Sequence, residues 1–256
     1  TTISIGIFSI VFLALVLLLT NVIISNSFRD LEKHEALKKL DSFRNRLDNE
    51  HQALEVIVRD WAHWDDMRDF VLNRNKRFID SNFSAEIFEN YRIHISTIMD
   101  KDFSPILALG YDFEDEELRD ISPIVSRSIS KLIPHLKPLK EEDAASIMIK
   151  TNSGPICLSF LPILDSSGNG PIHGYFMMGR YMNTQYLEDL GSTDKYRIKA
   201  IDLTKTLNSN IDYRVSQSKQ GNNVRFLDHN RISATDVISD INNDDLYLIE
   251  IEAAME

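Results

Sequence analysis

The sequence contains a single cysteine, Cys157, among 256 residues. One cysteine cannot form a disulfide within the chain, and no C-x-x-C pair or Cys/His spacing typical of zinc is present. His63, Asp65 and Asp66 lie close together, but no second histidine follows one helical turn away. We therefore predict neither a metal site nor any other cofactor.

Motifs of nucleotide-binding and hydrolytic enzymes are also missing. Gly168, Gly170 and Gly174 do not have the G-x-G-x-x-G spacing, and a tight turn between two strands explains them better. No G-x-S-x-G nucleophile motif occurs, and nothing in the sequence selects a pair of carboxylates for acid–base chemistry. We expect that this segment is not an enzyme and predict no catalytic residue.

Positive charge is scarce relative to negative charge. The chain has 28 Lys and Arg against 39 Asp and Glu, a formal net charge of −11. Nucleic-acid binding depends on basic side chains that neutralise phosphates, so we expect no nucleic-acid partner. The same balance argues against adhesion of the globular part to anionic lipid.

No charged residue occurs from Thr1 to Phe28, and this run is dominated by Ile, Leu, Val and Phe. About 20 apolar residues span a bilayer core, so the run predicts a membrane helix over residues 1–26. A cleaved signal peptide would have a basic start, which is absent here. Basic residues just after the run do not decide its orientation, because long following domains are translocated regardless of such charges.

Glycine and proline are absent from residues 29–71, and apolar residues recur there at steps of three and four. The members of this apolar seam are Leu40, Phe43, Leu47, Leu54, Ile57, Trp61 and Trp64. Glu50 interrupts the seam. The pattern predicts a long helix from Arg29 to about Val71, with residues 27–60 as a membrane-proximal segment. We expect its early part to pair with a second copy in a homodimer.

The rest of the chain alternates short apolar runs with turns. The expected strands are 91–99, 105–109, 145–150, 155–164, 172–181, 197–203, 224–227 and 246–252, with helices at 121–136 and 183–190. Residues 208–223 have the least structured pattern. Helix followed by antiparallel strands predicts an α+β fold, a PAS-like (Cache-like) sheet in residues 61–256.

Several motifs resemble those of a known family. They are D-W-A-H-W-D-D at residues 60–66, S-N-F-S at 81–84, Gly110-Tyr111-Asp112, P-I-L-D-S-S-G-N-G-P at 162–171 and M-G-R-Y at 178–181. Their succession resembles the fourth class of CHASE domain, an extracellular sensory module, over residues 35–186. The resemblance implies a PAS-like domain between two membrane helices, with a cytoplasmic histidine kinase or diguanylate cyclase in the same polypeptide.

Candidate ligand-binding residues come first from the end of the expected long helix. Trp61, Trp64 and Asp65 would share one helical face, because residues three and four apart are neighbours. Either they pack on the sheet, with Asp65 as a cap or ion-pair partner, or they form an aromatic site with a buried carboxylate. The second arrangement would suit a cationic or hydrogen-bonding ligand.

A second group lies in the expected strand 172–181. Phe176 and Arg180 have the same parity and so share one face, whereas Tyr175 and Tyr181 lie on the other face, half-exposed. A charged residue on an apolar face needs a partner, which would be Asp65, another carboxylate or a ligand carboxylate. We add Tyr91 and Tyr111 to the candidates because they are expected at strand edges.

We therefore expect the extracytoplasmic, ligand-sensing part of a receptor in the inner or plasma membrane, with its globular domain periplasmic or extracellular. Its partner would be a small molecule or a periplasmic protein. Two alternatives remain: a signal-anchored extracytoplasmic enzyme, and a structural module that assembles through a coiled coil.

Overall fold

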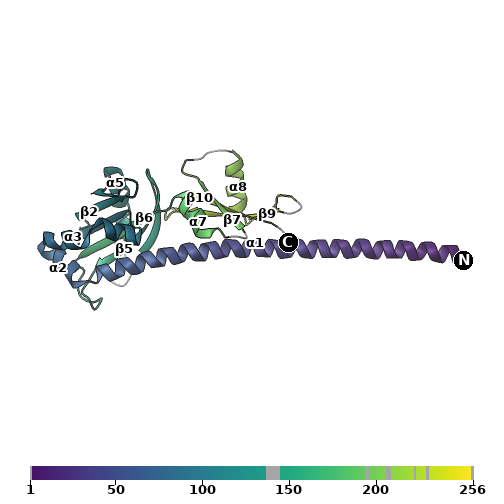
Figure 1. Cartoon of the computed structure of the whole chain (residues 1–256), viewed down its shortest axis with the longest axis horizontal. Helices are drawn as coiled ribbons and strands as arrows, with labels where there is room; N and C mark the ends of the chain where they lie inside the picture. Colours follow the sequence, from purple (N-terminus) through teal and green to yellow (C-terminus); the bar gives the residue numbers. More distant parts are fainter. Residues whose placement is uncertain are drawn as a thin grey trace.

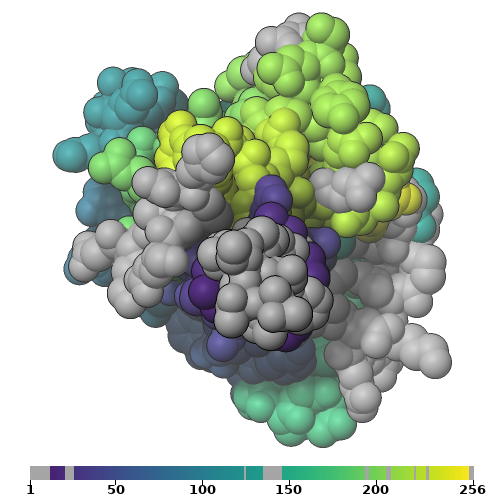
Figure 2. Space-filling view, turned by 90° about the vertical axis from the view of Figure 1, so that its right-hand side faces the viewer, coloured from purple at the N-terminus to yellow at the C-terminus, as the bar shows by residue number. Residues whose placement is uncertain are grey.

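The computed structural model describes residues 2–136, 145–193, 196–205, 209–221, 223–228 and 231–254. One helix, α1 (Thr2–Ala62), runs the length of the molecule, and two antiparallel sheets lie along it (Figure 1). The N-terminal part of α1 projects beyond the sheets. Figure 2, which looks along the molecule from that end, shows the helix emerging beside the C-terminal residues, drawn in yellow and yellow-green.

The first sheet has the strand order β3-β2-β1-β6-β5-β4. Its strands are β1 (Ile95–Asp100), β2 (Pro105–Asp112), β3 (Glu117–Asp120), β4 (Ala145–Thr151), β5 (Gly154–Ile163) and β6 (Gly174–Tyr181). Short helices α2 (Asp65–Asn73), α3 (Lys76–Asn82) and α4 (Ala85–Tyr91) connect α1 to β1, and α5 (Pro123–Ser130) and α6 (Ile133–Leu136) follow β3.

The second sheet has the order β7-β10-β9-β8. Its strands are β7 (Tyr196–Asp202), β8 (Val224–Phe226), β9 (Arg231–Ser239) and β10 (Asp245–Ala254). Helix α7 (Thr184–Gly191) joins the two sheets and packs with α1, whereas α8 (Ser209–Lys219) lies on the far side of the second sheet (Figure 1).

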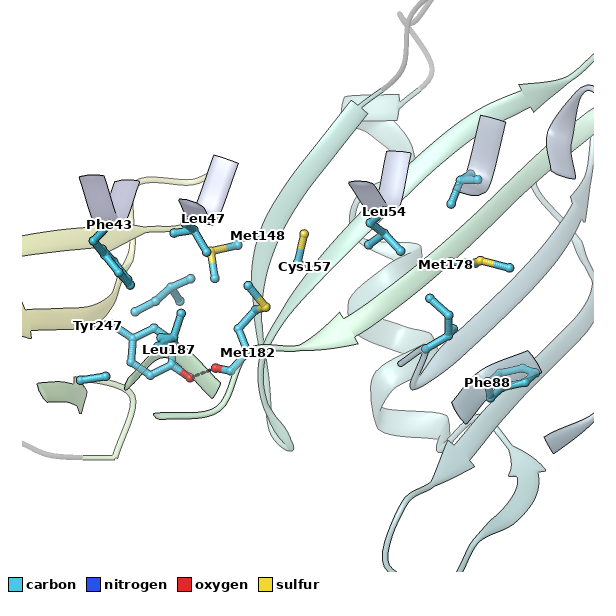
Figure 3. Close-up of a cluster of buried hydrophobic side chains, with 14 of the residues drawn as sticks. Phe43, Leu47, Leu54, Phe88, Met148, Cys157, Met178, Met182, Leu187 and Tyr247 are labelled. Carbon is cyan, nitrogen blue, oxygen red and sulfur yellow. Dashed lines mark hydrogen bonds between the residues drawn. The ribbon is translucent and has the colours of Figure 1, made fainter. Parts of the chain in front are cut away.

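The apolar seam of α1 is buried against the chain's own sheets. Leu40, Phe43 and Leu47 are at most 6% exposed, and they belong to one core with α7 and the second sheet. Leu54 continues this core under the first sheet (Figure 3). The predicted helical periodicity is confirmed, but this part of the seam is not free to pair with a second copy.

The long helix ends earlier than predicted, at Ala62 instead of about Val71. The carbonyl of Ala62 accepts a hydrogen bond from the amide of Leu164 at the end of β5, 3.2 Å away. Trp64 then adopts an extended conformation (φ −94°, ψ 129°) and precedes α2. A contact from a distant strand therefore breaks a segment whose local sequence favours helix.

No helix in the part of the chain that the structure describes is long and apolar enough to cross a membrane. The predicted membrane helix, residues 1–26, includes residues 1–11 and 21–25, whose side chains lie outside the described set.

A second core lies between the first sheet and α5. Val125 and Ile129 of α5 contact the sheet face that carries Tyr175 and Met177. Tyr175, expected to be half-exposed, is 9% exposed because its ring stacks against both Phe103 and Phe160. The first sheet is therefore covered by α1 on one face and by α5 on the other.

Most predicted strands are confirmed, including the hairpin between β1 and β2 and the β4-β5-β6 meander. The prediction failed in other places. Tyr91 ends helix α4 and is not at a strand edge, residues 209–219 form helix α8, and strands β3 and β9 and helix α3 were missed.

Candidate functional site

Strand β6 presents two different faces, as its alternation predicts. Phe176, Met178 and Arg180 point toward α1, whereas Met177 and Tyr181 point toward the α5 side. Arg180 and Tyr181 are adjacent at the end of this strand. The same short segment therefore has one side chain on the α1 face and the next on the α5 face.

On the α1 face, the predicted aromatic residues pack with each other. Trp61 stacks on Phe176 with ring centroids 5.9 Å apart and an interplanar angle of 15°, and Phe83 meets Trp61 edge-on at 5.2 Å. Trp64, 37% exposed, lies 6.2 Å from Trp61. These rings form an aromatic cluster in which Trp61 contacts two other predicted residues, Trp64 and Phe176.

Of the two arrangements expected for Asp65, the structure has the ion-pair partner and not the buried carboxylate. Its side chain is 47% exposed and accepts hydrogen bonds from the Ser166 hydroxyl (2.7 Å) and from Arg68 (2.7 Å). The Ser166 hydroxyl, assisted by the Arg68 charge, holds the pKa of Asp65 below its usual range. Because the helix breaks at Trp64, Asp65 begins a new helix and does not share a face with Trp61.

Arg180 has an internal partner, as expected for a charge on an apolar face, but the partner is Glu50 and not Asp65. The guanidinium lies 2.6 Å from the Glu50 carboxylate and donates to the carbonyls of Tyr91 (2.8 Å) and Arg92 (3.2 Å). The Tyr186 hydroxyl of α7 also donates to Glu50. This Arg180–Glu50–Tyr186 network joins β6, α1 and α7.

A cavity of about 690 Å³ opens on the other face of the first sheet, beside α5. Its walls come from the ends of β1, β2, β3 and β6. The lining side chains with rings or charges are His94, Tyr111, Asp112, Phe113, Glu114, Arg119, Asp120 and Tyr181. A cavity of this size accommodates a small organic molecule.

His94 is at the centre of the aromatic wall. Its ring centroid lies 4.6 Å from that of Phe113 and 5.2 Å from that of Tyr181. Its Nδ1 accepts a hydrogen bond from the backbone amide of Tyr181, which assigns the proton of the neutral ring to Nε2. Burial and the nearby Arg180 charge lower the pKa of His94 to about 4, so the ring is neutral at physiological pH.

Some of the charged side chains that line the cavity already form ion pairs within the chain. Arg119 lies 2.9 Å from Asp112, contacts Asp115, and lies 3.7 Å from Glu117. Two backbone amides bind Asp112 and, with Arg119, lower its pKa. Neither Glu114 nor Asp120 forms an ion pair with any residue that the structure describes.

Of the predicted site residues, Tyr111 alone lines the cavity, and its hydroxyl donates to Glu89. Trp61, Trp64, Asp65, Phe176 and Arg180 lie on the opposite face, and Tyr91 contributes a carbonyl to Arg180. Sequence reasoning missed His94, Phe113 and Arg119 as lining residues. The motif Gly110-Tyr111-Asp112 was the available signal, because its neighbour Phe113 extends the same strand end into the cavity.

Among the described residues, no group of three or more His, Cys, Asp and Glu side chains could hold a metal ion. His63 lies beside Gly168, and burial lowers its pKa. His63, Asp65 and Asp66, which are close in sequence, are divided between the end of α1 and the start of α2.

Comparison with known proteins agrees with this architecture. The CHASE4 domain model matches residues 46–199. The methanogenesis regulatory histidine kinase FilI of Methanothrix harundinacea (strain 6Ac) is 25% identical over 228 residues, 89% of this chain and 25% of that protein. The chain thus spans about a quarter of the length of this relative.

Two solved structures share the fold. The extracellular domain of vpHK1S-Z8, assigned as a histidine kinase, has a TM-score of 0.57 and 17% identity, covering 86% of this chain and 90% of that one. The periplasmic domain of Vibrio cholerae LuxQ has a TM-score of 0.52 and 13% identity, covering 86% and 98%. With the matched domain model covering more than half of the sequence, the chain belongs to the CHASE4 family of sensor domains.

Proposed function

We propose that this chain is the ligand-sensing module of a membrane receptor and that the cavity beside His94 is its ligand site. One observation carries the proposal: the cavity wall includes Tyr181, whose neighbour Arg180 is bound to Glu50 on α1. A molecule in the cavity that contacts Tyr181 would therefore be one residue away from the ion pair that joins β6 to the long helix. In this proposal the segment binds its ligand without converting it.

A second connection runs through α7. Asn183 lines the cavity, and its side-chain oxygen accepts a hydrogen bond from the amide of Tyr186 (2.8 Å), which caps α7. At the other end of α7, Gly191 lies against Phe43 of α1. Ligand contact with Asn183 would favour one placement of α7 on α1 over another.

The output follows from a shift in populations. A ligand that binds one arrangement of the first sheet and α1 more tightly than another increases the share of that arrangement. In this proposal α1 passes the change along its length toward a membrane, consistent with the uncharged run at residues 1–28. The globular part would be periplasmic or extracellular, and a histidine kinase like that of the relative, or a diguanylate cyclase, would lie elsewhere in the polypeptide.

The ligand site is tested by thermal unfolding of the full chain with a library of small organic molecules. A ligand at 100 times its dissociation constant adds about 2.7 kcal/mol of stability. Phe113→Ala, which removes a cavity ring, should abolish the shift. Tyr213→Ala, which removes an exposed ring on α8, is the matched control. A ligand whose shift survives Phe113→Ala binds elsewhere, which contradicts this site.

Transmission is tested in a receptor that carries this chain. Leu31 is exposed and precedes Ala36, where burial against the second sheet begins. A Gly-rich insertion after Leu31 should abolish the signalling response but leave ligand binding intact, because the buried part of α1, from Ala36 onward, is untouched. Retained signalling would contradict transmission along α1.

Dimerisation is proposed through the part of α1 that precedes its packed region. Phe28 and Leu31 are 56% and 61% exposed there, unlike the buried Leu40 and Phe43. Leu31→Lys should lower the dimer fraction in analytical ultracentrifugation, whereas an unchanged mass would contradict this surface.

A further inference from the structure

We propose that the His94 cavity selects a small organic cation such as a primary or quaternary amine. This inference rests on the proposed function, because it names the ligand class of the same site. It is carried by two features of the wall: aromatic rings on one side and uncompensated carboxylates on the other.

The aromatic side offers ring surface that is not fully used within the chain. Phe113 is 39% exposed although its ring contacts both His94 and Tyr111, at 4.6 and 4.8 Å between centroids. Tyr181 lies on the other side of His94. Cations are attracted to the faces of such rings, and the attraction grows when water is excluded.

The charged side is negative once its internal ion pairs are counted. Of the lining residues in the described part of the chain, three are carboxylates, Asp112, Glu114 and Asp120, and one, Arg119, is cationic. Arg119 is shared among Asp112, Asp115 and Glu117, so its charge is not free for an anionic ligand.

Among the lining residues that the structure describes, no other group adds positive charge. His94 is held neutral, since a protonated ring would be buried near Arg180. Arg180 itself points to the opposite face of β6, where it binds Glu50. An anion in the cavity would therefore meet carboxylates and no free cation among the described side chains, whereas an ammonium group would meet both attractive features.

The experiment compares choline with 3,3-dimethylbutan-1-ol, its neutral carbon isostere, by calorimetric titration of the full chain. Tetramethylammonium and putrescine extend the cation set, and acetate and succinate are the anionic probes. We expect at least one cation to bind on the order of tenfold more tightly than its neutral isostere and than either anion.

Two variants locate the site. Asp120→Asn should weaken cation binding on the order of tenfold, as expected when one carboxylate charge is lost near the ligand. Asp102→Asn makes the same change in the β1–β2 turn, outside the cavity lining, and should leave binding unchanged. Equal effects of the two variants would overturn the inference, because they would show only an influence of net charge.

The failure of this inference can be told apart from failure of the proposed function. If a neutral or anionic library compound binds and Phe113→Ala abolishes its binding, the ligand site stands and the cation class is wrong. If no cation in the set binds, the cation class is likewise wrong. Whether the cavity binds any ligand is then decided by the thermal-unfolding screen with the compound library. Cation binding that survives both Phe113→Ala and Asp120→Asn would place the cation elsewhere.

Discussion

Arg180 on β6 and Glu50 on α1 form an ion pair across the interface between the first sheet and the long helix, with 2.6 Å between the two side chains. Glu50 is the residue that interrupts the apolar seam of α1. Its place in the seam is explained by Arg180, whose side chain is only 10% exposed and would otherwise be buried without a counter-ion.

Arg180→Ala should therefore destabilise the protein by about 2–4 kcal/mol. This is somewhat less than for a fully buried pair, because the Glu50 side chain is 33% exposed. Urea unfolding measures the loss. Arg180→Lys, which keeps the charge but not the fork of donors to Tyr91 and Arg92, should give an intermediate value. A loss below about 0.5 kcal/mol for Arg180→Ala would place the pair among weak surface contacts.

Close packing between β1 and β6 gives a second prediction. A Cβ atom on Gly174 would lie 2.4 Å from the carbonyl oxygen of Met99, a backbone atom that cannot rotate away. Gly174→Ala should cost about 1–3 kcal/mol because the two strands must separate. Gly110→Ala in β2 is the matched control, because the atom nearest to its added Cβ would be 3.6 Å away. This variant should be nearly neutral in urea unfolding. Equal losses for both variants would refute the steric explanation.

Much of the fold could be predicted from sequence because it follows local pattern. The seam of α1 and the β4-β5-β6 meander have clear periods, and Asn183 begins α7 as a capping residue should. The end of α1 could not be predicted, because it depends on Leu164, a residue 102 positions later in the chain that binds the Ala62 carbonyl.

The candidate site was predictable only in part. Alternation along β6 correctly separated Arg180 from Tyr181, but it could not say which face would be filled by α1. Trp61 and Phe176 were chosen as aromatic residues near a charge, and the structure uses them as core. His94 has no motif of its own, and its place in the site depends on two ring neighbours, Phe113 and Tyr181, that come from distant parts of the chain.

The pH dependence of stability should report the half-buried histidines His51, His63 and His94. The pKa of His94 falls to about 4 in the folded state, chiefly through burial, against about 6.5 in the unfolded chain. Above pH 6.5 both states are neutral at this ring. Between pH 6.5 and 4 the His94 ring is protonated in the unfolded state but stays neutral in the folded state. Stability is therefore lost as pH falls through this window, by up to about 1.4 kcal/mol per pH unit for one such group.

Urea unfolding at pH 7, 6 and 5 measures this slope, and His94→Gln should reduce it. The slope should not vanish, because burial also lowers the pKa values of His51 and His63. Proton NMR gives the direct check: the His94 ring should not titrate above pH 5. A ring that titrates near 6.5 would show that it is charged in the folded protein at mildly acidic pH.

The second sheet holds its own buried ion pair, which should govern the stability of that part of the molecule. Glu250 of β10 is 5% exposed, forms an ion pair with Arg214 of α8 and accepts a hydrogen bond from Ser233 (2.9 Å). Arg214→Ala leaves the carboxylate with the Ser233 hydroxyl and, among the described residues, one cation, Arg225, 3.7 Å away, so we expect a loss of about 3 kcal/mol.

The matched control for Arg214→Ala is Arg231→Ala in the same sheet. Arg231 pairs with Asp228 at 2.8 Å, but the two side chains are 57% and 43% exposed, so the expected loss is below about 1 kcal/mol. Hydrogen exchange of the β9 and β10 amides, measured for both variants, shows whether the loss is confined to this sheet. Protection that falls equally in β5 and β6 after Arg214→Ala would mean that the two sheets unfold together, since they share the core on α1.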